Sequence, residues 1–115
     1  MKTIIAGSRS INNYALVLDA CVESCIPISE IISGGARGVD TVAQQIAREF
    51  NIPLTIMPAK WQEHGKIAGF LRNEEMARYA DALIAVWDGR SSGTKHMITI
   101  ARKFNLRIHI YANNN

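Results

Sequence analysis

The sequence lacks the features that place a chain in a membrane or in an export pathway. It has no apolar run of about 18 residues, the length that a membrane-spanning helix requires. A strand-like segment follows Met1 directly, without a positively charged leader before a long apolar stretch. We therefore expect a cytoplasmic protein that does not bind membranes.

Cysteine is also scarce, at two residues. Cys21 and Cys25 stand four apart in a segment with helical periodicity, which directs both side chains along one surface. No second cysteine or histidine pair completes a zinc site, and His64, His96 and His109 lack the mutual spacing of ligands. The sequence predicts two reduced core thiols, no metal site and no cofactor.

Neither sign of charge dominates. The 13 Lys and Arg residues barely exceed the 10 Asp and Glu residues, which argues against a nucleic-acid coat and fits a local anion site equally well. Apolar residues make up 48% of the 115 positions, enough for a sizeable core. We expect one domain over residues 1–112 and a polar tail over residues 113–115.

Five short apolar segments alternate with longer segments of helical period. The strand-like segments are Lys2–Ala6, Glu30–Ser33, Pro53–Met57, Ala82–Trp87 and Arg107–Tyr111. The helical segments are Asn12–Ser24, Val39–Phe50, Ile67–Ala80 and Gly93–Phe104. The longest connection, Pro58–Lys66, is expected to be irregular. This alternation predicts a three-layer α/β/α fold with a five-stranded, mainly parallel sheet. We expect the sheet to be Rossmann-like, with the strand order 3-2-1-4-5.

In such a sheet, the turns after strands one, two and four meet the connection after strand three at the carboxyl edge. A ligand site is expected there. The turn after strand two has glycines at three of five positions, which permit positive φ and close approach to a ligand, and a helix N-terminus follows. Its candidate phosphate-binding residues are Gly34, Gly35, Ala36, Arg37, Gly38 and Asp40.

Other interpretations of this turn stay open. Asp40 either caps the helix or holds a ribose hydroxyl, and the glycines also suit an ordinary tight turn. The spacing of Gly34 and Gly38, with Val39 in place of lysine, excludes a Walker A loop. The NAD fingerprint GxGxxG is missing as well, which argues against a dehydrogenase.

Two further turns combine small, hydroxyl and charged residues suited to phosphate. The candidates are Gly7, Ser8 and Arg9 after strand one, and Asp88, Ser91, Ser92, Gly93, Thr94 and Lys95 after strand four. Alternatively Arg9 is solvated, and Ser92 or Thr94 caps the next helix.

The third helical segment and the connection before it add further candidates. Arg72 and Asn73 reach the cleft if the start of their helix lies over it, although Arg72 also has Glu75 at i+3 spacing. Trp61, near Gly65, is either a core residue or a ring that stacks on a base.

Together, GSR at residues 7–9, GGARGVD at 34–40, W…HGKIAGFLRNEEMA at 61–77 and SGT at 92–94 resemble the SLOG superfamily, in particular its YspA/YpsA-like branch. The superfamily includes Lonely Guy phosphoribohydrolases and the DprA-type domain, and the resemblance implies a Rossmann-like nucleotide-ligand domain. Lonely Guy proteins cleave an N-glycosidic bond with an arginine before an MA segment and a PGGxGTxxE motif. Arg72 is similar to that catalytic arginine, but Met97 stands at the glutamate position and Asp88–Ser91 replaces the PGG lead.

Three hypotheses follow. The first is a sensor or sequestering protein that binds a nucleotide or an ADP-ribose-like or cyclic nucleotide derivative. The second is a nucleoside-monophosphate N-glycosidase that uses Arg72 with Asp40, Glu74 or Asp88, because an oxocarbenium-like transition state needs a carboxylate. The third, single-stranded DNA binding, lacks the interleaved aromatic and basic stripe, so nucleic acid is not the expected partner. The resemblance also implies a phage-associated homo-oligomer, a dimer or a tetramer.

Overall fold

The computed structural model describes residues 1–112, so the tail expected at 113–115 lies outside the described residues. Five strands form one sheet in the order β3-β2-β1-β4-β5, and each neighbouring pair is parallel. The strands are β1 (Lys2–Gly7), β2 (Glu30–Ser33), β3 (Leu54–Ile56), β4 (Ala82–Trp87) and β5 (Arg107–Ala112). The predicted fold class and strand order are confirmed.

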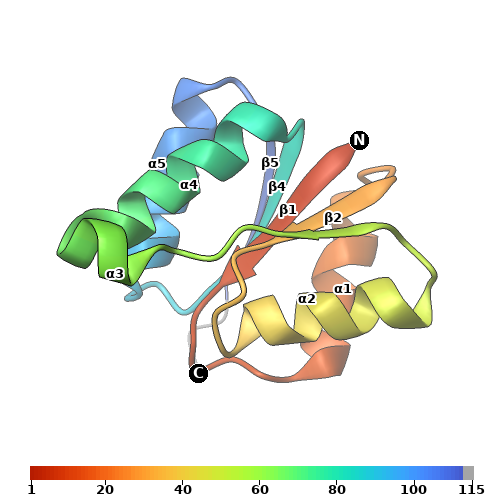
Figure 1. Ribbon diagram of the computed structural model, residues 1–115. Helices are drawn as coiled ribbons and strands as arrows, with labels where there is room; N and C mark the ends of the chain where they lie inside the picture. The colour runs from red at the N-terminus through yellow and green to blue at the C-terminus, as the bar shows by residue number, and fades with distance from the viewer. Residues whose placement is uncertain (113–115) are drawn as a thin grey trace.

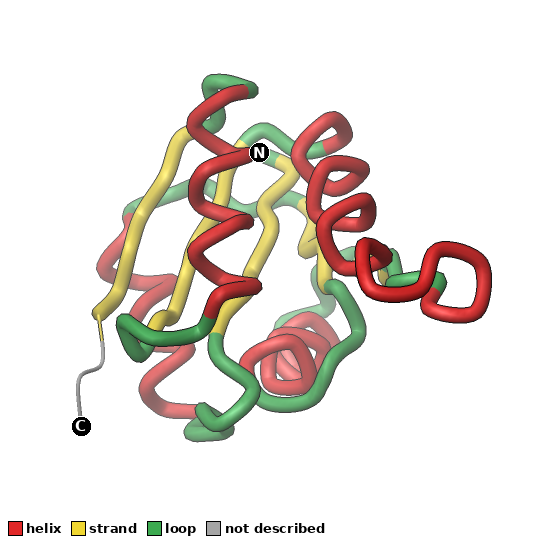
Figure 2. Tube along the Cα trace, turned by 90° about the vertical axis from the view of Figure 1, so that its left-hand side faces the viewer, coloured by secondary structure: helices red, strands yellow, loops and turns green. Residues whose placement is uncertain are grey.

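Helices cover both faces of the sheet (Figure 1). They are α1 (Tyr14–Ser24), α2 (Val39–Glu49), α4 (Ala68–Tyr79) and α5 (Ser92–Lys103). Successive strand residues point to opposite faces, so Ile5 and Ile84 pack with α1 and α2, while Ile4 and Leu83 pack with α4 and α5. Figure 2, turned by 90°, shows the strands between the two helical layers. None of the helices in residues 1–112 is long and apolar enough to cross a membrane.

The connection after β3 is not irregular throughout. It contains α3 (Trp61–His64) and the 3-10 turn η1 (Gly65–Ile67), none of whose residues is buried. Gly65, with φ of 58°, separates the two short elements. The sequence did not indicate them because a single turn is too short to show a helical period. This segment, with the start of α4, projects from the body of the molecule (Figures 1 and 2).

The prediction of two core thiols is wrong for one of them. Cys21 is half-buried on α1, and burial raises the pKa of its thiol to about 11. Cys25 is exposed, because α1 ends at Ser24 and Cys25 takes a left-handed φ of 57° at the helix end. Both cysteines are unpaired.

Candidate functional site

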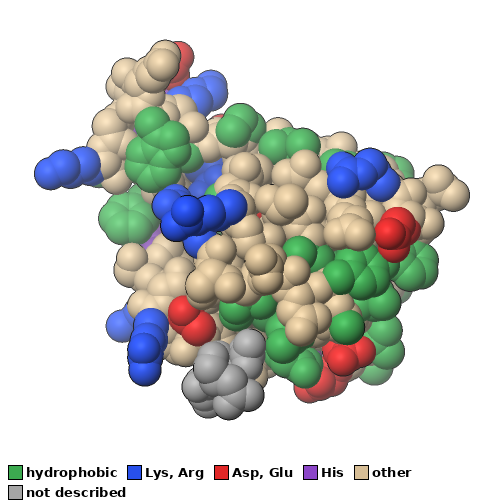
Figure 3. All heavy atoms as spheres, turned by 90° about the horizontal axis from the view of Figure 1, so that it is seen from below, with side chains coloured by type: hydrophobic (Ala, Val, Ile, Leu, Met, Phe, Trp, Pro, Cys, Tyr) green, Lys and Arg blue, Asp and Glu red, His purple; other side chains and the backbone are tan. Residues whose placement is uncertain are grey.

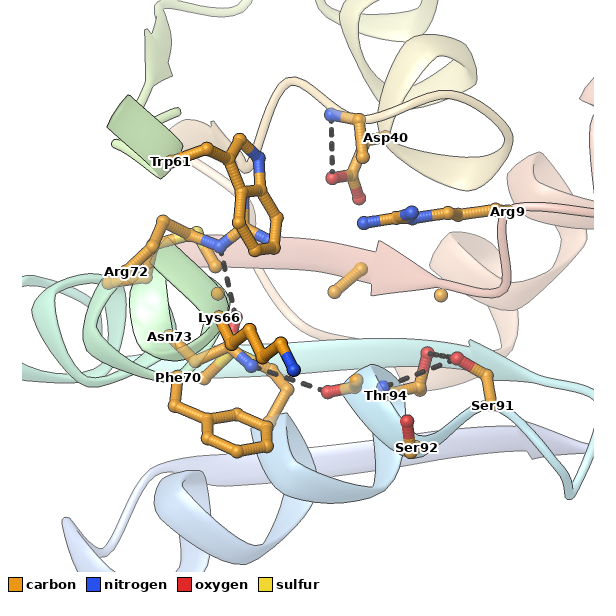
Figure 4. A pocket seen from close by; sticks show the side chains of 17 residues that line it. Arg9, Asp40, Trp61, Lys66, Phe70, Arg72, Asn73, Ser91, Ser92 and Thr94 are labelled. Atoms are coloured by element: carbon orange, nitrogen blue, oxygen red, sulfur yellow. Dashed lines mark hydrogen bonds between the residues drawn. The ribbon is translucent and has the colours of Figure 1, made fainter. Parts of the chain in front are cut away.

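A cavity of about 460 Å³ lies beside the carboxyl end of β1 and the starts of α2, α4 and α5. The predicted site residues that line it are Gly7, Arg9, Ala36, Asp40, Trp61, Arg72, Asn73, Ser91, Ser92, Gly93 and Thr94. Figure 4 shows their side chains, and Figure 3 shows Lys, Arg and apolar side chains lying close together on one side of the face seen from below. The topology thus brings three turns and α4 together, as the order of the strands requires.

Several predicted residues lie outside the cavity lining. They are Ser8, Gly34, Gly35, Arg37, Gly38, Asp88 and Lys95. Arg37 and Lys95 have exposed side chains, whereas Ser8 and Gly34 are buried behind the lining. A role in ligand binding for these residues stays a prediction, and the structure gives several of them a supporting role instead.

Arg72 is held in place by two hydrogen bonds. Its Nη1 donates to the Gly34 carbonyl oxygen at 2.7 Å, and its Nε donates to Asn73 Oδ1 at 3.1 Å. A Cβ atom at Gly34 would stand 2.4 Å from Arg72 Nη1, so only glycine lets the guanidinium approach the β2 turn this closely. Arg72 therefore contacts the turn after β2 and does not pair with Glu75.

Asn73 links α4 to α5. Its Oδ1 faces the Arg72 donor, so its amide nitrogen is directed to the Gly93 carbonyl oxygen at 3.3 Å and to His96 Nδ1 at 3.1 Å. His96 Nδ1 must accept this bond, which requires a neutral imidazole. Burial lowers the pKa of His96, consistent with that state, although the nearby Glu74 opposes the shift. Phe70 packs on the other side of His96, with the ring centroids 4.3 Å apart.

Asp40 is a buried carboxylate at the start of α2. Burial raises its pKa to about 6, although the Ala36 amide and the charges of Arg72 and Arg9 act in the opposite direction. Its Oδ2 accepts a hydrogen bond from Ala36 N at 3.1 Å. The N-cap of α2 is Gly38, so Asp40 braces the preceding loop rather than capping the helix.

Three amide groups of the glycine-rich turn after β2 are already bonded within the protein. Gly35 N donates to Ser33 Oγ, Ala36 N donates to Asp40 Oδ2, and Val39 N donates to the Ser8 carbonyl oxygen. The β1 turn also covers the helix N-terminus, since a Cβ atom at Gly38 would stand 2.5 Å from the Arg9 carbonyl oxygen. The turn therefore already holds an anion, the Asp40 carboxylate.

The N-terminus of α5 is arranged differently. Ser91 is its N-cap, where Ser92 or Thr94 was expected, and Ser91 Oγ accepts from Thr94 N at 3.4 Å. Asp88 holds the loop by accepting from the amides of Arg90 and Ser91 at 2.8 Å each, and these bonds lower the pKa of Asp88. The amide groups of Ser92 and Gly93 have no hydrogen-bond partner within residues 1–112, and both residues line the cavity.

Sequence reasoning did not assign six of the lining residues to ligand contact. They are Ala6, Lys66, Gly69, Phe70, Met76 and Met97. A Cβ atom at Gly69 would stand 3.4 Å from the ring of Trp61. A glycine inside a helical segment was the available signal, because it often marks such a close approach. Lys66 and Phe70 gave no such signal, since their place at the cavity depends on how α3 and η1 fold.

Comparison with known proteins identifies the family of the chain. A family model described as "YspA, cpYpsA-related SLOG family" matches residues 1–64. The chain belongs to this family. The chain is similar to a "Gene 61 protein" of Mycobacterium phage D29, 38% identical over 111 residues, an alignment that covers 89% of each chain. No solved structure matches the chain significantly.

In this SLOG protein, the three carboxylates considered as catalytic partners of Arg72 have different surroundings. Asp40 lines the cavity, Glu74 pairs with Arg78 at 2.7 Å, and Asp88 braces its own loop. Met97 is buried at the cavity wall. Among residues 1–112, no group of three or more His, Cys, Asp or Glu side chains is placed to hold a metal ion.

Proposed function

We propose that this SLOG protein binds a nucleotide or a nucleotide-derived ligand in the cavity, with a phosphate group at the N-terminus of α5. The observation that carries the proposal is the pair of amides at Ser92 and Gly93, which have no partner within residues 1–112 and belong to cavity-lining residues at the start of a 12-residue helix. Unpaired amides and the positive end of the helix dipole favour bound anions. The hydroxyl groups of Ser91 and Ser92 supply further donors, whereas Thr94 Oγ1 donates to Ser91 Oγ at 3.2 Å.

The charge of the cavity supports an anionic ligand. Arg9, Lys66 and Arg72 line it, whereas Asp40 is the one acidic residue among its lining residues within 1–112. Because burial raises the pKa of Asp40 to about 6, part of that negative charge is neutralised below this pH. An excess of positive charge in a concave site attracts phosphorylated ligands. The cavity size also falls within the range of roughly 300–1,000 Å³ that is usual for small-molecule sites.

The test is calorimetric titration with AMP of the wild type and two variants. Ser92→Asp places a carboxylate at the first turn of α5, where it suits the helix dipole but repels a phosphate. Asn12→Asp adds the same charge at an exposed position beside the α1 N-cap, outside the cavity lining, and is the matched control.

We expect Ser92→Asp to weaken AMP binding roughly tenfold or more, since hydrogen bonds to a charged group contribute about 1.5–3 kcal/mol. Asn12→Asp should bind as the wild type does. Equal loss in both variants would show that only long-range charge matters. If AMP, cyclic AMP and ADP-ribose all fail to bind the wild type, the proposed function is wrong.

A second candidate function is hydrolysis of the N-glycosidic bond of a nucleoside monophosphate. It rests on Asp40, a buried carboxylate with a pKa raised to about 6, in the same cavity as Arg72. Figure 4 shows Arg9 directed toward Asp40. The Arg72 guanidinium also lies near Asp40, because a Cβ atom at Gly34 would stand 2.4 Å from Arg72 Nη1 and 2.8 Å from Asp40 Oδ2. A carboxyl group that titrates near neutral pH is suited to activate water or to stabilise an oxocarbenium-like transition state.

Incubation with AMP, followed by chromatography for adenine, tests this candidate. Asp40→Asn keeps an oxygen that can accept from Ala36 N and removes only the carboxylate function. Catalytic release of adenine by the wild type, lost in Asp40→Asn, would support hydrolysis. Binding of AMP without adenine release would exclude AMP hydrolysis and leave the binding function in place.

A further inference from the structure

Trp61 offers a supported aromatic surface at the edge of the cavity. It lies on α3, its side chain lines the cavity, and the residue is 51% exposed. Its ring packs against α4 at Gly69, where a Cβ atom would stand 3.4 Å from the ring. Glycine at this position therefore lets the indole lie close to the helix backbone. A large aromatic side chain held this way is fixed from one side and open on the other.

Phe70 provides a second surface with its own support. It is 50% exposed, lines the same cavity, and packs against the ring of His96 at 4.3 Å between centroids, with 34° between the ring planes. His96 is in turn fixed by the amide of Asn73. In Figure 4 the Lys66 side chain lies between Trp61 and Phe70. Two aromatic rings and one cation from three consecutive elements thus border one end of the cavity.

The opposite end of the cavity has a different chemistry. Ser91, Ser92 and Thr94 lie there in Figure 4, on the far side of Lys66 from the Trp61 ring. That end carries the hydroxyl groups and open amides assigned above to phosphate, and it has no aromatic lining residue within 1–112. The cavity is therefore polarised, with flat apolar surfaces at one end and anion-binding donors at the other.

We propose that the Trp61 and Phe70 end is a base subsite, so that the protein selects ligands with a planar aromatic base over sugar phosphates. This inference rests on the proposed function, because it assumes that a phosphorylated ligand occupies the α5 end. Stacking on an aromatic ring accepts any base with a π-face, and each stacked base contributes appreciably to affinity. A flat ligand between or upon the two rings would cover apolar surface of Trp61 and Phe70 that is otherwise exposed to solvent.

The experiment compares AMP with ribose 5-phosphate, which carries the same phosphate and sugar without the base. Titrations use the wild type, Trp61→Ala, Trp61→Phe and Phe70→Ala. Phe50→Ala is the matched control, because Phe50 is 54% exposed and lies outside the cavity lining. Tryptophan fluorescence, read as the difference between wild type and Trp61→Phe, reports whether AMP quenches Trp61.

We expect ribose 5-phosphate to bind the wild type more weakly than AMP by a factor of roughly ten or more. Each alanine variant at Trp61 or Phe70 should weaken AMP binding by roughly the same factor. Ribose 5-phosphate binding should stay unchanged in those variants. Trp61→Phe should retain most of the AMP affinity, since it keeps a stacking ring, and Phe50→Ala should retain all of it. AMP should quench Trp61, and ribose 5-phosphate should not.

Two results would overturn the base subsite while leaving the phosphate site intact. One is equal binding of AMP and ribose 5-phosphate, with no effect of the Trp61 and Phe70 variants. The other is a change of oligomeric state in those variants, seen by sedimentation, while the ratio of AMP to ribose 5-phosphate affinity stays unchanged. That result would show that Trp61 and Phe70 contact a second copy of the chain. Failure of both ligands to bind the wild type, together with failure of cyclic AMP and ADP-ribose, would instead refute the proposed function itself.

Discussion

Replacing Asp40 by asparagine removes a charge that the fold buries at a cost. Asp40 is 6% exposed, and burial is the main cause of its raised pKa. Asparagine has nearly the same shape and keeps an acceptor for Ala36 N, so the loop between β2 and α2 should remain in place. The substitution therefore separates the charge of this side chain from its role in holding the loop.

The pKa of Asp40 determines both the sign and the size of the effect. Raising the pKa from 3.8 to about 6 means that the folded protein binds a proton that the unfolded chain has released. The corresponding stabilisation, about 3 kcal/mol, is fully present below about pH 4 and is lost as the pH rises through about 6. Asp40→Asn does not titrate and so should not lose this contribution.

Urea unfolding of wild type and Asp40→Asn over the range from about pH 4 to about pH 7 measures the difference. The free energy of unfolding of the variant, relative to wild type, should increase by about 2 kcal/mol across this range, which is most of the full contribution. Glu30 and Glu74, whose carboxyl pKa values are lowered by hydrogen bonds, cancel because both proteins contain them. A difference that stays constant with pH would refute the assignment of a raised pKa to Asp40.

Three other predictions follow from local geometry. Gly38→Ala should destabilise the protein by more than about 1 kcal/mol in urea unfolding, because Gly38 has φ of 79° and lies close to backbone carbonyls. Gly93→Ala is the comparison: no atom lies within 4 Å of the added Cβ, so this variant should be as stable as the wild type or more stable. Asn73→Ala should cost about 1–3 kcal/mol in urea unfolding, because Arg72 Nε and His96 Nδ1, on two half-buried side chains, lose their partner. Maleimide should label the exposed Cys25 rapidly. It should label Cys21, whose thiol pKa is raised to about 11, only on unfolding. Equal labelling rates for the two cysteines would contradict this prediction.

Much of the framework was predictable because its signals are local. Strand limits at Glu30–Ser33 and Ala82–Trp87 agree with the structure, and the other strands differ by one or two residues at an end. The sequence did not reveal α3 and η1, whose single turns show no period, nor the place of Lys66 and Phe70 at the cavity. Arg72 was identified as a site residue, yet its partner is the Gly34 carbonyl, a contact across 38 residues that no local pattern encodes.

The sequence by itself determined the fold class and the set of turns at the carboxyl edge of the sheet, because apolar periodicity and the handedness of crossovers constrain these directly. Only the tertiary structure decided which amide groups of those turns are bonded within the protein and which have no partner. Glycine spacing does not reveal which acceptors the amides of a turn will meet. Here the amides of Gly35 and Ala36 after β2 are used by Ser33 and Asp40, whereas the amides of Ser92 and Gly93 at the start of α5 have no partner within residues 1–112. Burial, which sets the pKa of Asp40, likewise depends on segments that are distant in the chain.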